Sequence, residues 1–203
     1  MQIENHKEEV PFEFYREKFA ALDAQKAAER LGVPFCDGAF VVTLLGTTYR
    51  ISHPQYAIEA DSDGIALHSL PAQTFLLRLI LEGKPAAHSD EFRTFRELPW
   101  GEVYIKPFTG RVLTRAAFSF GTCPEKFRRA AEKLGALPLK HGDAAYEFVL
   151  WDGYRMRMIV WEGDDEFPPN AQILYSANFA DGFAAEDRVV AGDLLISALK
   201  ATF

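Results

Sequence analysis

The chain has 203 residues, enough for one large domain or two small ones, and its 48% hydrophobic and 25% charged residues are typical of a globular protein. Its net charge of −7 argues against a nucleic-acid partner, which would require a basic surface. The longest apolar stretch, at residues 75–83, is too short to span a membrane, and the charged N-terminus lacks the apolar core of a signal peptide. We therefore expect a soluble, cytoplasmic protein without a membrane partner.

Apolar residues at helical spacing predict a first helix over residues 10–32, with Gly32 as its C-terminal cap. The β-branched run 39–52, interrupted by Gly46, predicts a hairpin, and residues 56–60 and 64–69 predict two short strands. A second helix is predicted over residues 70–83. In the middle of the chain, Ser89 or Asp90 is expected to cap a short helix. Residues 98–108 are expected to form a loop and a short strand, and residues 110–121 a helix.

Thr122 and Glu125 form a capping-box pattern that predicts the start of a further helix, which ends at Gly135. Asp152-Gly153 stands between two strand-like runs and predicts a tight hairpin turn. Residues 171–176 predict another strand, and residues 184–200 predict a closing helix. These elements indicate an α+β fold, with mostly antiparallel sheets covered by helices.

Two similar hexapeptides point to an internal repeat: AAERLG begins at Ala27 and AAEKLG at Ala130, and each precedes a hairpin. The pattern is also a common way for a helix to end, because Gly caps helices. A duplication would give two related halves, 10–84 and 121–203, with an insertion at 85–120, packed as a single compact domain over 1–203. The cleft between such halves is where we expect a ligand.

The acidic run EGDDE, residues 162–166, is the first candidate site. Alternate side chains of an extended segment share a face, so Asp164 and Glu166 are candidate ligands for a divalent cation such as Mg²⁺ or Ca²⁺. The alternative is a solvated turn that Pro168 and Pro169 stiffen.

Arg155 and Arg157 are candidate ligand-binding residues, because guanidinium groups bind anions bidentately. A two-residue turn would place Leu150 opposite Arg155 and Phe148 opposite Arg157. The alternatives are ion pairs with the acidic residues just downstream, or packing of the arginine stems over aromatic rings.

The segment LPWGEVY adds Trp100 and Tyr104 as candidate ligand contacts, since an aromatic residue on a glycine-containing loop often lines a binding surface. The alternative for Trp100 is a core plug that anchors the loop. Cys36 and Cys123 lack metal-site spacing, so we expect free thiols in a reducing compartment. No nucleotide-binding or nucleophile motif is present in the sequence, and it identifies neither a catalytic residue nor a cofactor.

The chain resembles the family called domain of unknown function 3786, found in bacteria and archaea. The matching residues lie in two segments: Phe95, Leu98, Pro99, Gly101, Tyr104 and Phe108, and then Trp161, Asp164, Glu166, Phe167, Pro168 and Leu174. The resemblance implies no established activity. Relatives that carry an iron–sulfur domain hint at anaerobic metabolism, but this chain has no such cysteine set.

Two functions follow as hypotheses. The first is a non-catalytic accessory protein that binds a small molecule, a cofactor or a protein partner. The second is a carboxylate-based, cation-dependent enzyme with its site at residues 162–166.

Overall fold

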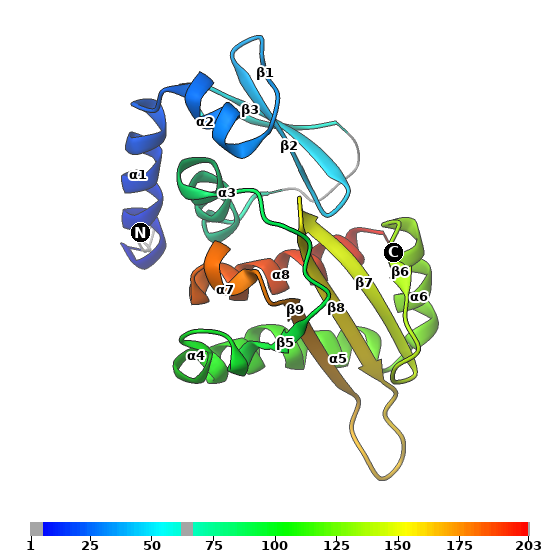
Figure 1. Ribbon diagram of the computed structural model, residues 1–203. Helices are drawn as coiled ribbons and strands as arrows, with labels where there is room; N and C mark the ends of the chain where they lie inside the picture. The colour runs from blue at the N-terminus through cyan, green and yellow to red at the C-terminus, as the bar shows by residue number, and fades with distance from the viewer. Residues whose placement is uncertain (1–5, 62–66, 203) are drawn as a thin grey trace, which may run out of the picture. The chain divides into compact units, whose positions relative to one another are not determined.

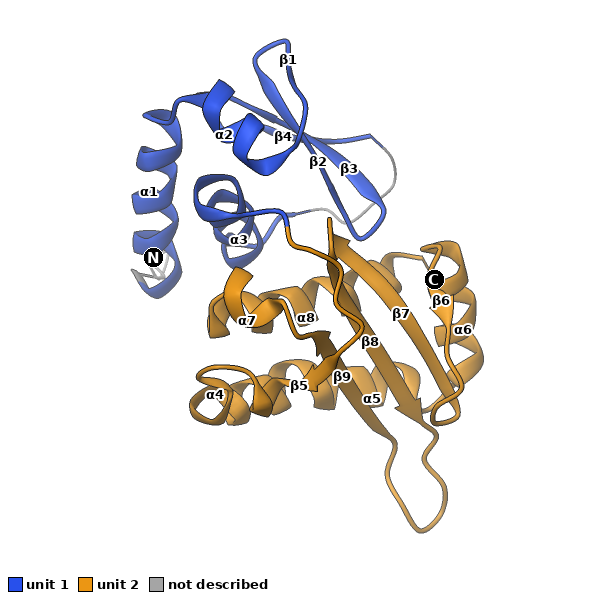
Figure 2. Cartoon of the chain, in the orientation of Figure 1, with its two compact units in different colours: residues 1–85 blue, residues 86–203 orange. Residues whose placement is uncertain are grey.

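The computed structural model describes residues 6–61 and 67–202 and has an α+β fold (Figure 1). The chain forms two compact units, residues 1–85 and 86–203 (Figure 2). Each unit has its own antiparallel sheet: β1-β2-β3-β4 in the first and β5-β9-β8-β7-β6 in the second. Residues 86–120 belong to the second unit.

The first unit combines a four-stranded sheet with three helices, of which α1 packs against α3. Its elements are α1 (His6–Ala20), α2 (Ala24–Leu31), β1 (Phe35–Cys36), β2 (Ala39–Leu44), β3 (Thr47–Ser52), β4 (Ile58–Ala60) and α3 (Leu70–Glu82). The β2–β3 hairpin and α3 confirm the predicted elements. The prediction of one helix over residues 10–32 was wrong: the side chain of Asp23 accepts a hydrogen bond from the backbone of Lys26 and starts α2 as a separate helix. Part of the strand predicted at 64–69 lies outside the described residues.

The second unit begins with a short strand and a broken helix. Its first elements are β5 (Phe92–Thr94), the 3₁₀ turn η1 (Phe95–Glu97), α4 (Gly101–Phe108), the π-helical turn η2 (Thr109–Leu113) and α5 (Thr114–Phe120). The prediction of a short helix near Ser89 was therefore wrong. Residues 98–100 form the predicted loop, but a helix stands where the short strand was predicted. Tertiary packing accompanies the helix at residues 101–108. Its last residue, Phe108, is fully buried and stacks on Phe95 with ring centroids 4.1 Å apart.

The rest of the second unit is a helix, an antiparallel meander and two further helices. Its elements are α6 (Pro124–Lys133), β6 (Leu137–Pro138), β7 (Ala144–Trp151), β8 (Tyr154–Trp161), β9 (Asn170–Ser176), α7 (Phe179–Gly182) and α8 (Ala185–Ala201). Cys123, rather than the predicted Thr122, is the N-cap of α6. Helices α5 and α6 cover one face of the sheet, whereas the segment that precedes β5 crosses the other face (Figure 1).

The core of the second unit lies between this sheet and its helices. Met156, Met158, Ile173 and Tyr175 are fully buried on the helix-covered face, and Phe127 of α6 packs edge-on against Tyr146 of β7. Burial of each such side chain contributes roughly 1.5–3 kcal/mol. The sheet is therefore a rigid platform for the polar groups on its other face.

The two units share an order of elements. A helix, a short strand, a hairpin, a strand and a helix follow one another in α2 to α3 and again in α6 to α8, apart from the short α7. Gly32 and Gly135, which end the two similar hexapeptides, both adopt a positive φ. The internal duplication stays a prediction.

Candidate functional site

The β7–β8 hairpin carries both predicted arginines, but its register differs from the prediction. Arg157 lies opposite Glu147 and Arg155 opposite Val149, because an irregularity between Val149 and Trp151 adds one residue to β7. The expected partners Leu150 and Phe148 were therefore wrong. The shift brings a carboxylate onto the face that carries the two guanidinium groups.

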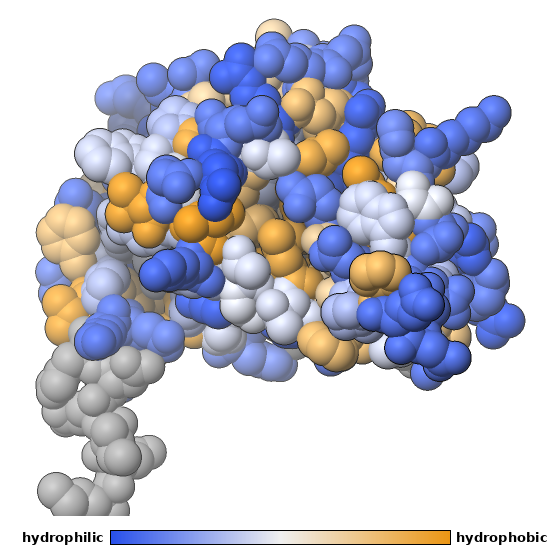
Figure 3. Space-filling view, turned by 90° about the horizontal axis from the view of Figure 1, so that it is seen from below, coloured by the Kyte–Doolittle hydropathy of each residue, from blue (hydrophilic) through white to orange (hydrophobic). Residues whose placement is uncertain are grey.

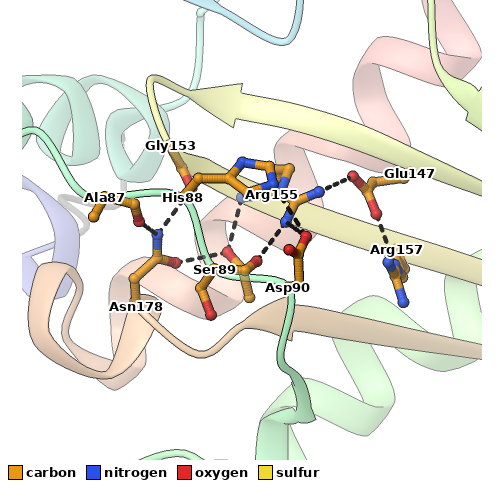
Figure 4. A network of polar contacts seen from close by, with 10 residues as sticks. Ala87, His88, Ser89, Asp90, Glu147, Gly153, Arg155, Arg157 and Asn178 are labelled. Atoms are coloured by element: carbon orange, nitrogen blue, oxygen red, sulfur yellow. Dashed lines mark hydrogen bonds and ion pairs between the residues drawn. The ribbon is translucent and has the colours of Figure 1, made fainter.

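Glu147 joins the two arginines (Figure 4). Arg155 Nη1 donates to Glu147 Oε1 at 2.5 Å, and Arg157 Nε donates to Oε2 at 2.7 Å. Glu147 is 6% exposed and Arg155 is 9% exposed, so both charges are paired largely out of water. The Arg157 guanidinium also lies 3.6 Å from the centre of the Phe92 ring. Both predicted alternatives for the arginines therefore occur, ion pairing and packing over an aromatic ring. The paired acid, Glu147, precedes the arginines in the sequence, whereas the expected acids follow them.

The segment that enters the second unit is tied to the same hairpin. Arg155 Nη2 donates to Asp90 at 2.9 Å and to the carbonyl of Ser89. The hydrogen bond from Arg155, with a further one from His88, lowers the pKa of Asp90. The amide of Asn178 donates to the carbonyls of Ala87 and Gly153, at 3.1 and 2.8 Å.

Gly153 is needed for this close approach, because an added Cβ would lie 2.1 Å from the carbonyl oxygen of Ala86. These contacts occupy both Nη atoms of Arg155, whereas its Nε has no hydrogen-bond partner within the described residues. They give Arg155 a structural role that needs no ligand, and the prediction that Arg155 and Arg157 bind a ligand is not tested by them.

The family-like segment forms a tight turn before α4. Trp100 has a φ of +62° and is 74% exposed, so it is not a core plug. Gly101 cannot carry a side chain there, since a Cβ would lie 1.9 Å from the carbonyl oxygen of Phe95. The hydroxyl of Tyr104 donates to the carboxylate of Glu186 on α8, and this hydrogen bond raises the pKa of Tyr104. Trp100 and Tyr104 thus start one helix, but only Trp100 projects largely into solvent.

A buried arginine lies beneath this turn. Arg188 of α8 is 1% exposed and donates from Nη2 to the carbonyl oxygen of Pro99. Its Nε and Nη1 have no hydrogen-bond partner within the described part of the chain, and burial lowers its pKa. The sequence contains a hint of this group, since Arg188 follows two acidic residues and precedes the apolar run of α8, but sequence reasoning missed it.

The acidic segment forms the turn between β8 and β9. The carboxylate of Asp164 accepts the backbone N–H groups of Phe167 and Glu166, at 2.7 and 2.8 Å, and these hydrogen bonds lower the pKa of Asp164. Asp164 and Glu166 are both exposed. Within residues 6–61 and 67–202, no group of three or more His, Cys, Asp or Glu side chains is placed to hold a metal ion. The prediction of metal binding by Asp164 and Glu166 stays untested, although Asp164 already has a structural task.

A basic pocket lies on the solvent side of α6, where none of the predicted site residues is found. It has a volume of about 680 Å³, and its lining residues are Lys126, Arg129, Ala130, Glu132, Lys133 and Thr202. Residues 126, 129 and 133 share one face of a helix by their spacing. The opposite face of α6 buries Phe127 and Ala131 and thereby fixes the three cations toward the pocket.

The charges and surface of this pocket, called the α6 pocket below, suit an amphiphilic anion. Three cationic side chains face one carboxylate, that of Glu132, on a protein whose net charge is −7. The Nζ of Lys133 donates to the carbonyl of Thr202 at 2.8 Å, which holds the end of α8 against α6. Most of the wall is apolar, because the methylene stems of the long side chains form it, over the buried Ala130.

The sequence did contain a signal for the α6 pocket. Four of the ten residues of α6 are Lys or Arg, and three of them recur at helical spacing. Caps and apolar periodicity do not reveal this pocket, because its signal is the periodicity of charge. The role of Thr202 could not be predicted, since its contact with Lys133 joins residues 69 positions apart.

Comparisons with known proteins identify one family. The sequence profile of domain of unknown function 3786 matches residues 23–198. No curated protein and no solved structure matches the chain significantly. No helix within the described residues is long and apolar enough to cross a membrane. The profile covers both compact units, and the chain is therefore a member of the family called domain of unknown function 3786.

Proposed function

We propose that the protein is a non-catalytic binding protein that holds a small anionic molecule in the α6 pocket. The observation that carries the proposal is the pocket of about 680 Å³ in which Lys126, Arg129 and Lys133 face one carboxylate among the described lining residues. Its volume is within the usual range for small-molecule sites, roughly 300–1,000 Å³. The proposal places the ligand on the second unit alone.

The expected ligand has a carboxylate or phosphate group and an apolar body. The anionic group would pair with the ends of Arg129 and the two lysines, and a planar guanidinium suits a carboxylate or phosphate in two-point contact. The apolar body would cover the aliphatic stems of the long side chains, which form most of the wall. Inorganic phosphate, which has no apolar body, is expected to bind more weakly than benzoate.

The experiment is an isothermal titration of the full chain with benzoate and with inorganic phosphate. Replacing both Arg129 and Lys133 by Gln should weaken benzoate binding about 10-fold, since each partly exposed ion pair contributes up to about 1 kcal/mol. Replacing Lys7 and Lys18 of α1 by Gln removes the same charge elsewhere and should leave binding unchanged. Absence of benzoate binding, or equal losses in both double variants, would refute the proposal.

The cation-dependent enzyme has no comparable support. The carboxylate of Asp164 holds its own turn through two backbone hydrogen bonds, and Asp165 and Glu166 are exposed beside it. We therefore propose no catalytic role for residues 162–166.

The cellular setting is also part of the proposal. We propose a reducing, cytoplasmic compartment, because Cys36 and Cys123 both carry free thiols. We propose no nucleic-acid partner, because the net charge of −7 would oppose binding to a phosphate backbone. A role in anaerobic metabolism remains an expectation from the family resemblance.

A further inference from the structure

The outer side of α4 and α5 exposes large apolar side chains, called the α4–α5 ridge below. Trp100, Val103 and Phe118 are 74%, 68% and 61% exposed. Figure 3 views the molecule from the side on which these helices lie in Figure 1 and shows hydrophobic residues among hydrophilic ones. Trp100 and Val103 are neighbours at the start of α4, whereas Phe118 lies about four helical turns further along. The first two form the apolar part of the ridge that a partner would cover.

Cations and carboxylates both lie beside the ridge, and the carboxylate of Glu186 already accepts a hydrogen bond from Tyr104. Lys106 and Arg111 are exposed, and no ion pair within the described residues joins either to a carboxylate. Glu102, the acidic residue of α4, is paired with Arg96 at 3.0 Å. A partner that covers the ridge should therefore present an apolar side chain flanked by carboxylates.

The chain itself carries a segment of this chemistry. Phe167 is 68% exposed at the β8–β9 turn, directly after Asp165 and Glu166. The turn projects away from the sheet (Figure 1). The hydrogen bonds of Asp164 fix the turn, so docking it would order few additional groups.

We propose that the β8–β9 turn of one copy docks on the α4–α5 ridge of a second copy. Phe167 would contact Trp100 and Val103, while the adjacent carboxylates would pair with Lys106 and Arg111. The exchange is reciprocal, since each copy has one turn and one ridge, and the simplest closed arrangement is a two-fold dimer. This inference is independent of the α6 pocket.

The test is sedimentation equilibrium of the full chain over a range of concentrations. We expect a monomer–dimer equilibrium that weakens with added salt, because the rim pairs are screened. Phe167→Ser should raise the dimer dissociation constant at least about 10-fold, as for a central apolar contact. Val149→Ser, which removes an exposed apolar residue from the hairpin, should leave the constant unchanged.

Charge-reversal variants test which residues pair across the proposed contact. Glu166→Lys alone and Lys106→Glu alone should each weaken the dimer, whereas both changes in one chain should restore it, since each pair is then again of opposite charge. Circular dichroism confirms that each variant is folded. A monomer at every concentration would overturn the proposal. A dimer that Phe167→Ser and the charge exchange leave unchanged would do so as well.

Discussion

Replacing Glu147 by Ala should destabilise the second unit by about 3 kcal/mol. Glu147 is the shared partner of Arg155 and Arg157. Because the site is buried, little water can take the place of the lost carboxylate. Removing one partner of a buried ion pair typically costs about 3–5 kcal/mol, because the other charge stays buried and unpaired. The lower end applies here, since Arg155 keeps Asp90 as a partner and the Arg157 side chain is 27% exposed.

Urea unfolding followed by tryptophan fluorescence measures this loss. All three tryptophans of the chain, Trp100, Trp151 and Trp161, lie in the second unit, so the signal reports on that unit. Glu91→Ala is the matched control: the Glu91–Arg93 pair is exposed, and its removal should cost no more than about 1 kcal/mol. A Glu147→Ala loss no larger than that of the control would refute the reasoning.

A second variant separates burial of charge from packing. Changing Glu147 to Leu together with Arg155 and Arg157 to Met removes all three charges and roughly keeps their volume. We expect it to recover most of the stability lost in Glu147→Ala, because apolar replacements of buried ion pairs are often neutral or stabilising. A loss larger than that of Glu147→Ala would show that the hydrogen bonds of Arg155 to Ser89 and Asp90 dominate.

Three further predictions concern the two tight turns. Gly101→Ala should cost about 3 kcal/mol in the same urea assay, because its Cβ would collide with the backbone of Phe95; a loss below about 1 kcal/mol would contradict this. Trp100→Gly should gain about 1 kcal/mol, since glycine tolerates the positive φ and little packing is lost; a net loss would show that the exposed indole stabilises the turn. The Asp164 carboxyl should titrate below the ordinary value of 3.8, because it accepts two backbone N–H groups. Its contribution to stability is then present above that value and lost as the pH falls through the lowered pKa; a carbon-13 NMR titration at or above 3.8 would contradict this.

Periodicity and turn residues were sufficient to predict the regular parts of the fold. The α+β class, the hairpin at Asp152-Gly153, and helices α3 and α8 follow the sequence pattern. Where the predicted elements were wrong, specific side-chain contacts accompany the observed structure. The hydrogen bond of Asp23 divides the first predicted helix, and the stack of Phe95 on Phe108 accompanies a helix where β-branched residues indicated a strand.

The polar sites were harder to predict, because their partners are far apart in the sequence. The pairing of Arg155 was expected, but the register that selects Glu147 depends on a one-residue irregularity that no turn motif encodes. Arg188 is buried by a turn that lies 89 residues earlier. The α6 pocket could have been predicted, because its three cations stand at helical spacing in a single helix. Charge periodicity is therefore a useful signal alongside apolar periodicity.

The most direct test of the α6 pocket is to map where benzoate binds, by nitrogen-15 NMR titration of the full chain. The account predicts that amide signals of α6 and of Thr202 shift in a saturable way, while those of the β7–β8 hairpin and of residues 162–167 stay in place. Shifts centred on Arg155 and Arg157, or on the acidic turn, would contradict it, and so would the absence of any saturable shift.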